Sequence, residues 1–169
     1  MLQKNQETEF LELIGKHQGI IHKVCSVYEH TVHARQDLFQ EIIIQLWRNW
    51  HQYRGEASFS TWLYRVAINT AITFYRKQRK NMEAAADAYY KQALPDEAYK
   101  ETEEQIQILY RTLHHLTHLE RAIVLLYFDN KSYKEMEDVL GIKEGTLRVK
   151  MNRLKEKLRH LLTSQTYGT

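Results

Sequence analysis

A stretch near the middle of the chain carries side chains that could contact a polyanion. Spaced three or four residues apart, they would share one face of a helix: Trp62, Arg65, Asn69, Thr73 and Arg76. That face offers a flat ring, guanidinium groups and an amide. Between Glu56 and Glu83 there is no acidic residue, and there are five Lys or Arg. The pattern is typical of a nucleic-acid-binding helix, although a solvated amphipathic helix with a basic last turn would also show it.

The adjacent face of the same stretch is apolar, which predicts a single helix over residues 59–80 with one side in a core. The apolar stripe consists of Phe59, Leu63, Val66, Ala67, Thr70 and Phe74. The preceding segment, 53–58, is predicted to be a loop in which Gly55 allows a tight turn. Either Ser58 or Ser60 is available to cap the helix.

Residues that typically begin and end helices are spaced near the C-terminus in a way that predicts a helix-turn-helix. Thr117 to Glu120 has capping-box spacing and should open a helix that ends near Phe128. Ser132 to Glu135 repeats this spacing and should open a short helix that ends at Leu140. Gly141 is placed to end that helix, and another should follow from Glu144 to about Leu162.

The last of these helices has the features of a DNA recognition helix. Its apolar face consists of Leu147, Met151, Leu154 and Leu158. The opposite side near its N-terminal end carries Gly145, Arg148, Val149 and Asn152, where such helices meet base edges. From Lys143 to His160 there are seven Lys or Arg against two Glu, a balance that suits phosphate contacts. A helix-turn-helix used only for packing is the alternative.

Three further helices are expected before residue 53, near 6–16, 18–30 and 34–50. The third carries more apolar side chains than one core stripe needs: Phe39, Ile42, Ile43, Leu46, Trp47 and Trp50. We therefore expect Trp47 or Trp50 to face a partner.

The composition and the small number of helix-breaking residues together predict an all-α protein. The chain has 169 residues, 43% of them apolar, with one proline and six glycines. Residues 81–103 are acidic, contain Pro95 and show no sustained apolar face. A short helical piece is expected near 84–90. We therefore expect two small helical domains, 1–80 and 104–169, joined by an acidic linker over 81–103.

Several classes of function are disfavoured. A lone cysteine, Cys25, allows no internal disulfide or zinc–thiolate cluster and is expected to be a core residue. No apolar run could span a bilayer, so we expect a cytoplasmic protein. There is no HExxH or P-loop motif, and we expect neither catalysis nor a cofactor. His114, His115 and His118 are interpreted as a surface cluster and not as metal ligands.

Three blocks of the sequence resemble one protein family. They are DLFQEIIIQLW (37–47), YRGEASFSTWLYRVAINTA (53–71) and SYKEMEDVLGIKEGTLRVKMNRLKEKL (132–158). In this order they resemble the extracytoplasmic-function (ECF) group of bacterial sigma factors, the interchangeable promoter-specificity subunits of RNA polymerase. The resemblance implies a non-catalytic protein that binds core polymerase and promoter DNA. It also implies an anti-sigma factor as a partner, which in this family is often membrane-bound.

The resemblance also implies roles for individual residues. Docking on the polymerase β′ subunit is implied for Asp37, Gln40, Glu41, Leu46 and Trp47. Reading and opening of the −10 element is implied for Arg54, Trp62, Arg65 and Asn69, with Arg76 and Lys77 on phosphate and Asn69 on an unpaired base. Recognition of the −35 element is implied for Arg148, Val149, Asn152 and Arg153, with Thr146 and Lys150 on phosphate.

Three positions depart from the family pattern. Glu137 stands where a small residue normally packs, and we expect it to tilt outward. Lys143 replaces the usual serine-like cap of the recognition helix, and Leu154 stands where alanine is common. Two other classes of function stay open at this point, a stand-alone helix-turn-helix regulator and a helical metal-dependent hydrolase.

Overall fold

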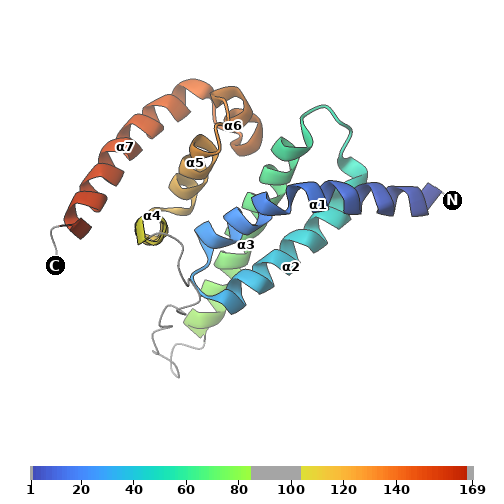
Figure 1. Cartoon of the computed structure of the whole chain (residues 1–169), viewed down its shortest axis with the longest axis horizontal. Helices are drawn as coiled ribbons and strands as arrows, with labels where there is room; N and C mark the ends of the chain where they lie inside the picture. The colour runs from blue at the N-terminus through green and yellow to red at the C-terminus, as the bar shows by residue number, and fades with distance from the viewer. Residues whose placement is uncertain (1, 85–103, 167–169) are drawn as a thin grey trace. The chain divides into compact units, whose positions relative to one another are not determined.

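The computed structural model describes residues 2–84 and 104–166, and its secondary structure there is helical (Figure 1). The chain divides into two compact units, Met1–Pro95 and Asp96–Thr169, here called unit 1 and unit 2. The all-α prediction is thus confirmed. The predicted linker, with its short helical piece, lies outside the described residues except for 81–84, which continue a helix.

Unit 1 is built from three long helices that pack against one another, α1 (Leu2–Tyr28), α2 (Val32–Asn49) and α3 (Phe59–Ala84) (Figure 1). A single 3-10 turn, η1 (Trp50–Gln52), follows α2. Each helix contributes fully buried apolar side chains, among them Ile21, Val24, Leu38, Ile42, Leu46, Leu63 and Ala67. Their burial supplies the main driving force for bringing α3 against α2.

The prediction of separate helices at 6–16 and 18–30 is wrong, because α1 runs unbroken through both. Gly15 and Gly19 each disfavour a helix by about 1 kcal/mol relative to alanine. Burial of Phe10, Ile21 and Val24 against α2 and α3 outweighs that cost. Both glycines are exposed, so the helix loses no core packing at either position.

Side-chain caps fix the beginnings of α2 and α3. The Thr31 hydroxyl accepts a hydrogen bond from the Ala34 N–H at 3.1 Å. The Ser58 hydroxyl accepts one from the Thr61 N–H at 3.2 Å, so Ser58 is the cap of α3. Gly55 has a φ of +73°, as predicted for a tight turn in the loop before α3. The turn at Gly55 and the cap at Ser58 therefore set the direction in which α3 begins.

The lone cysteine is a core residue, as predicted. Cys25 is 2% exposed, and burial, followed by the nearby charge of Glu29, raises the pKa of its thiol to about 12. At neutral pH it is therefore a protonated thiol and a poor nucleophile. Within residues 2–84 and 104–166, no helix is both long and apolar enough to cross a membrane.

Unit 2 contains α4 (Glu104–His114), α5 (His118–Phe128), α6 (Tyr133–Leu140) and α7 (Glu144–Thr166). Both predicted capping boxes are present, Thr117 with Glu120 and Ser132 with Glu135. Gly141 ends α6 in the left-handed conformation, with a φ of +70°. The predicted helix-turn-helix is confirmed, and α7 extends four residues beyond its predicted end.

The capping glutamate of α5 also ties that helix to α7. The Lys157 ammonium donates to both carboxylate oxygens of Glu120, at 3.0 and 2.9 Å. Burial alone would raise the pKa of Glu120, but hydrogen bonds from Lys157 and from the Thr117 backbone outweigh burial and lower it. One carboxylate therefore caps α5 and fixes it against α7.

A buried arginine closes the turn between α4 and α5. Arg121 is 6% exposed, and its guanidinium donates to the carbonyl oxygens of Leu116 at 3.1 Å and His114 at 2.9 Å. The His114 carbonyl is at the last residue of α4, where the helix offers it no donor, and the Leu116 carbonyl lies in the turn that follows. Beside this turn His115 is exposed, whereas His114 and His118 are half-buried.

Candidate nucleic-acid interface

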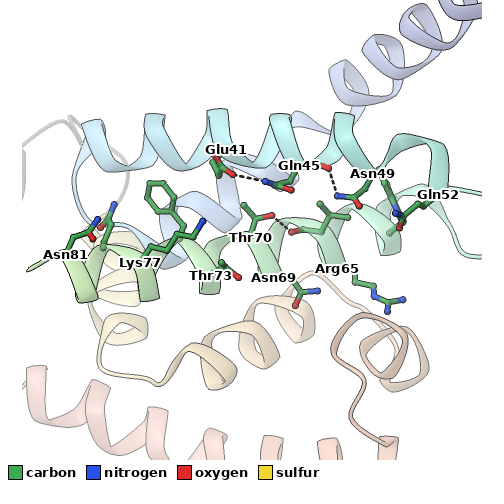
Figure 2. Close-up of a pocket in the computed structure, with 14 residues that line it drawn as sticks. Glu41, Gln45, Asn49, Gln52, Arg65, Asn69, Thr70, Thr73, Lys77 and Asn81 are labelled. Carbon is green, nitrogen blue, oxygen red and sulfur yellow. Dashed lines mark hydrogen bonds between the residues drawn. The ribbon is translucent and has the colours of Figure 1, made fainter. Parts of the chain in front are cut away.

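The predicted polar face of α3 borders a groove in unit 1 with a volume of about 770 Å³ (Figure 2). The wall from α3 includes Trp62, Arg65, Asn69, Thr73 and Lys77. The facing wall comes from α2 and η1 and consists of Glu41, Gln45, Asn49 and Gln52. The floor includes Val66, Thr70 and Phe74 from the half of α3 nearer the core.

Carboxamides are the most frequent side chains in the lining of this groove. They are Gln45, Asn49, Gln52, Asn69, Gln78 and Asn81. An amide carries both donors and an acceptor, which is the pattern needed to match a base edge. With the cations of Arg65 and Lys77 at its border, the groove can hold bases and phosphates together.

Glu41 is the one carboxylate among the lining residues, and its position is fixed by its neighbours. Its Oε1 accepts a hydrogen bond from the Gln45 side-chain amide at 2.8 Å, and the Asn49 side-chain amide donates to the backbone carbonyl of Gln45 at 2.7 Å. In Figure 2 Arg65 and Asn69 point away from α2, on the outer side of α3. Phosphates would therefore be favoured on the side of α3, away from Glu41.

An aromatic cluster holds Trp62 at the end of this groove. Trp50 lies at its centre, with ring centroids 5.5 Å from Phe10, 5.6 Å from Tyr53, 6.3 Å from Phe59 and 6.0 Å from Trp62. Trp62 is half-buried, so part of its ring packs in the cluster and part lines the groove. A ring held in this way can stack on a base with little loss of rotamer entropy.

The other predicted residues of this face are less closely grouped. Arg54, in the loop before α3, and Arg76 are exposed and do not line the groove. The α2 wall was missed by the sequence analysis, although 41, 45, 49 and 52 recur at helical spacing. Only Glu41 was singled out, and for a different partner. The signal was present as a polar stripe directly beside the buried apolar residues of the same helix.

The outer surface of α2 combines charged and apolar side chains. Asp37 and Gln40 are exposed, as is Trp47 at 47% and, unpredicted, Ile44 at 43%. The prediction that an apolar surplus faces outward is confirmed for Trp47, whereas Trp50 is enclosed by rings. Leu46 is 0% exposed, so it supports this surface from the core and cannot itself contact a partner.

The recognition helix presents its predicted side chains to solvent. Exposed residues near its beginning are Thr146, Arg148, Val149, Asn152 and Arg153, with Lys150 half-buried. The predicted apolar face, with Leu147 and Leu154 among its members, is buried. The two faces of α7 are thus separated as the sequence predicted.

Glu137 does not tilt outward as expected but turns toward the start of α7. Its Oε2 accepts a hydrogen bond from the Glu144 N–H at 3.1 Å. Lys143, just before α7, has no side-chain acceptor to offer its first N–H groups. Glu137 supplies an acceptor for one of these groups, the Glu144 N–H, from the preceding helix, so it partly compensates for the lysine at 143.

Replacing Glu137 with alanine is therefore expected to destabilise unit 2 by about 0.5–2 kcal/mol, the cost of losing a helix cap. Glu137→Gln should retain most of the stability, because its amide oxygen can still accept the hydrogen bond. Chemical unfolding followed by far-UV circular dichroism would measure both. Equal losses in the two variants would mean that the charge of Glu137, not its acceptor, matters.

Comparison with known proteins identifies both units. Residues 13–81 match the family model for sigma-70 region 2, and residues 106–158 match the model for sigma-70 region 4. The ECF RNA polymerase sigma-E factor of Escherichia coli K12 is 31% identical over 169 residues, covering 92% of this chain and 87% of that protein. The ECF sigma factor SigW of Bacillus subtilis is 28% identical, covering 95% and 92%.

Two solved structures share the fold. One is the sigma factor RpoE in complex with the anti-sigma factor NepR from Bartonella quintana, with a TM-score of 0.68, 19% identity and coverage of 95% of this chain and 98% of that one. The other is CnrH in complex with the cytosolic domain of CnrY, with a TM-score of 0.69, 18% identity and coverage of 94% and 90%. With the family matches in both units, the chain belongs to the ECF group of RNA polymerase sigma factors.

Proposed function

We propose that unit 1 opens promoter DNA at the −10 element in the groove between α2 and α3, while unit 2 recognises the −35 element. The groove carries the proposal, because it combines Trp62 as a stacking platform with amides and cations within one cavity. The domain roles follow the matched regions, with residues 1–80 for core binding and the −10 element and 104–169 for the −35 element. A non-catalytic protein of this family supplies specificity, and polymerase supplies the chemistry.

The −10 element would be held as single-stranded DNA. Asn69 is exposed on the outer side of α3 and borders the groove, where its amide can pair with the edge of an unstacked base. Phosphate contacts are assigned to the cations around that position, Arg54, Arg65, Arg76 and Lys77.

The −35 element would be held as a duplex. The exposed start of α7 suits insertion into a major groove, as in other helix-turn-helix proteins. Base contacts are assigned to Arg148, Val149, Asn152 and Arg153, and phosphate contacts to Thr146 and Lys150.

Core RNA polymerase would dock on the outer surface of α2. Asp37, Gln40 and Trp47 are exposed there, and Ile44 adds apolar area. A charged and aromatic surface of this kind suits a specific protein interface. Glu41 lines the groove and Leu46 is buried, so these two would act by positioning α2.

An anti-sigma factor is a further proposed partner. RpoE of Bartonella quintana was solved with the anti-sigma factor NepR, and CnrH with the cytosolic domain of CnrY. The similarity in fold supports a comparable regulator here, which could be membrane-bound. The site of action would be the cytoplasm, where promoter DNA and polymerase are found.

Reconstitution with core RNA polymerase tests the function. The chain is expected to co-elute with core enzyme in gel filtration and to support run-off transcription from a subset of a promoter library. Sequence-specific binding of a promoter duplex by the chain alone, without co-elution, would favour a stand-alone regulator and overturn the proposal.

Asn69→Ala is expected to weaken open-complex formation by about 1–3 kcal/mol, because one base loses its hydrogen-bonding partner. Permanganate footprinting of the melted promoter would measure this effect. Co-elution of the variant with core enzyme should be unchanged. Gln18→Ala is the matched control, since Gln18 is an exposed amide on α1 outside the groove. Wild-type opening by Asn69→Ala on every active promoter would contradict the assignment of this face.

A further inference from the structure

Arg148, an exposed side chain of the recognition helix, is held by two neighbours in the absence of DNA. Its Cζ lies 4.4 Å from the centroid of the Tyr133 ring, at the first position of α6. A guanidinium nitrogen lies 3.6 Å from the carboxylate of Glu144, one turn earlier in α7. That separation exceeds a hydrogen bond, and both groups are solvent-exposed, so the pair contributes little. The Tyr133 ring is therefore the main support.

Stacking on a ring leaves the chemistry of an arginine available. A guanidinium carries its five N–H donors in its own plane, so a ring on one face does not block the edge. An arginine that is free in solution loses about 2 kcal/mol of rotamer entropy when it is fixed. A side chain already oriented by a ring loses less on binding, and it is oriented before DNA arrives.

The backbone that carries the Tyr133 ring is fixed relative to α7. Tyr133 follows directly after Ser132, whose hydroxyl and backbone belong to a complete capping box with Glu135. From the same helix Glu137 accepts the Glu144 N–H, and Met136 is fully buried. The hydrogen bond from Glu144 to Glu137 and the burial of Met136 thus set the position of α6, and with it the position of Tyr133, at the start of α7.

We propose that Tyr133 is a specificity-determining residue that positions Arg148 for bidentate recognition of a guanine in the −35 duplex. This inference rests on the proposed function of α7. Guanine is the base that offers two acceptors, O6 and N7, at the spacing of an arginine fork. Discrimination arises because an arginine held in one direction cannot readily turn to a neighbouring base or phosphate.

The test uses the full chain with core RNA polymerase. Promoters are first selected from fragments with a randomised −35 region. Transcription is then compared between the selected sequence and its single-base substitutions. The ratio of two promoters for one protein preparation does not depend on how much of that preparation is folded, so a stability defect does not change it.

Arg148→Ala is expected to reduce discrimination at one guanine by roughly 5- to 150-fold. Tyr133→Leu should reduce discrimination at the same guanine by roughly two- to fivefold, the range for an exposed cation–π contact, and Tyr133→Phe should retain it. Tyr133→Met serves as a second ring-free variant should the leucine variant not fold. In the Arg148→Ala background, loss of the ring should change nothing further.

The outcomes separate this inference from the proposed function. Loss of discrimination in Arg148→Ala but not in either ring-free variant would overturn the role of Tyr133 alone. An equal loss in Tyr133→Phe would overturn it as well, because the hydroxyl and not the ring would matter. Unchanged discrimination in Arg148→Ala would overturn both this inference and the assignment of Arg148 to the −35 element.

Discussion

Arg121→Met is expected to destabilise unit 2 by about 2–6 kcal/mol while leaving unit 1 unaffected. The guanidinium satisfies the carbonyls of Leu116 and His114 in a buried position. Methionine keeps much of the apolar stem but leaves both carbonyls without this donor, at about 1–3 kcal/mol each. Because a domain of this size has only about 5–15 kcal/mol of stability, unit 2 would be marginal.

The placement of the tryptophans makes this measurement selective. Trp47, Trp50 and Trp62 are the only tryptophans of the chain, and all lie in unit 1. In urea unfolding of the full chain, fluorescence therefore reports unit 1, while far-UV circular dichroism reports both units. Arg121→Met should shift part of the dichroism transition and leave the fluorescence midpoint in place.

Arg111→Met is the matched control for Arg121. Arg111 is an exposed arginine in the last turn of α4, so its replacement removes the same charge without burying an unpaired carbonyl. Its effect is expected to stay within about 0.5 kcal/mol. A comparable loss in both variants would show that net charge, and not the buried hydrogen bonds, sets the stability of unit 2.

Trp50→Ala is expected to destabilise unit 1 by about 3 kcal/mol, at the low end for an aromatic-to-alanine change because Trp50 is half-buried. Its ring contacts Phe10, Tyr53, Phe59 and Trp62, so its removal leaves a cavity where α1, η1 and α3 meet. Urea unfolding followed by the fluorescence of the remaining tryptophans would measure the loss. Promoter opening should fall as well, since Trp62 loses a supporting contact.

Trp47→Ala distinguishes the role of the aromatic cluster in stability from the role of the outer surface of α2 in binding. Trp47 contacts Phe10 at 5.0 Å but is 47% exposed, so its loss should cost clearly less stability than that of Trp50. It should instead weaken binding to core polymerase. Equal destabilisation by the two variants would place the centre of the cluster elsewhere.

Local signals in the sequence predicted most of the helix boundaries in unit 2. Capping boxes at Thr117 and Ser132 and the glycine at 141 act through hydrogen bonds and backbone geometry within a few residues. Such signals depend only on residues that are close together in the sequence, so they can be recognised without the fold. The same holds for the two faces of α7, which follow from helical periodicity.

The errors arose where distant packing decides the outcome. Gly15 and Gly19 lower helix propensity, but the core contacts that carry α1 through them come from α2 and α3. The inward turn of Glu137 depends on an N–H seven residues away that only the fold brings near. The groove was half predicted, because its α3 wall was recognised and its α2 wall was not.

The hydrogen bond between Glu137 and the Glu144 N–H has a consequence for how this sequence can change over time. Positions 137 and 143 are expected to be epistatic, because each can offer an acceptor to the N–H groups at the start of α7. A mutational path that first places serine at 143 gains a cap for the next N–H groups of α7, which offsets the loss of Glu137 and allows a small residue there. A path that loses Glu137 first passes through a weakened intermediate, so selection should favour one order of substitution over the other.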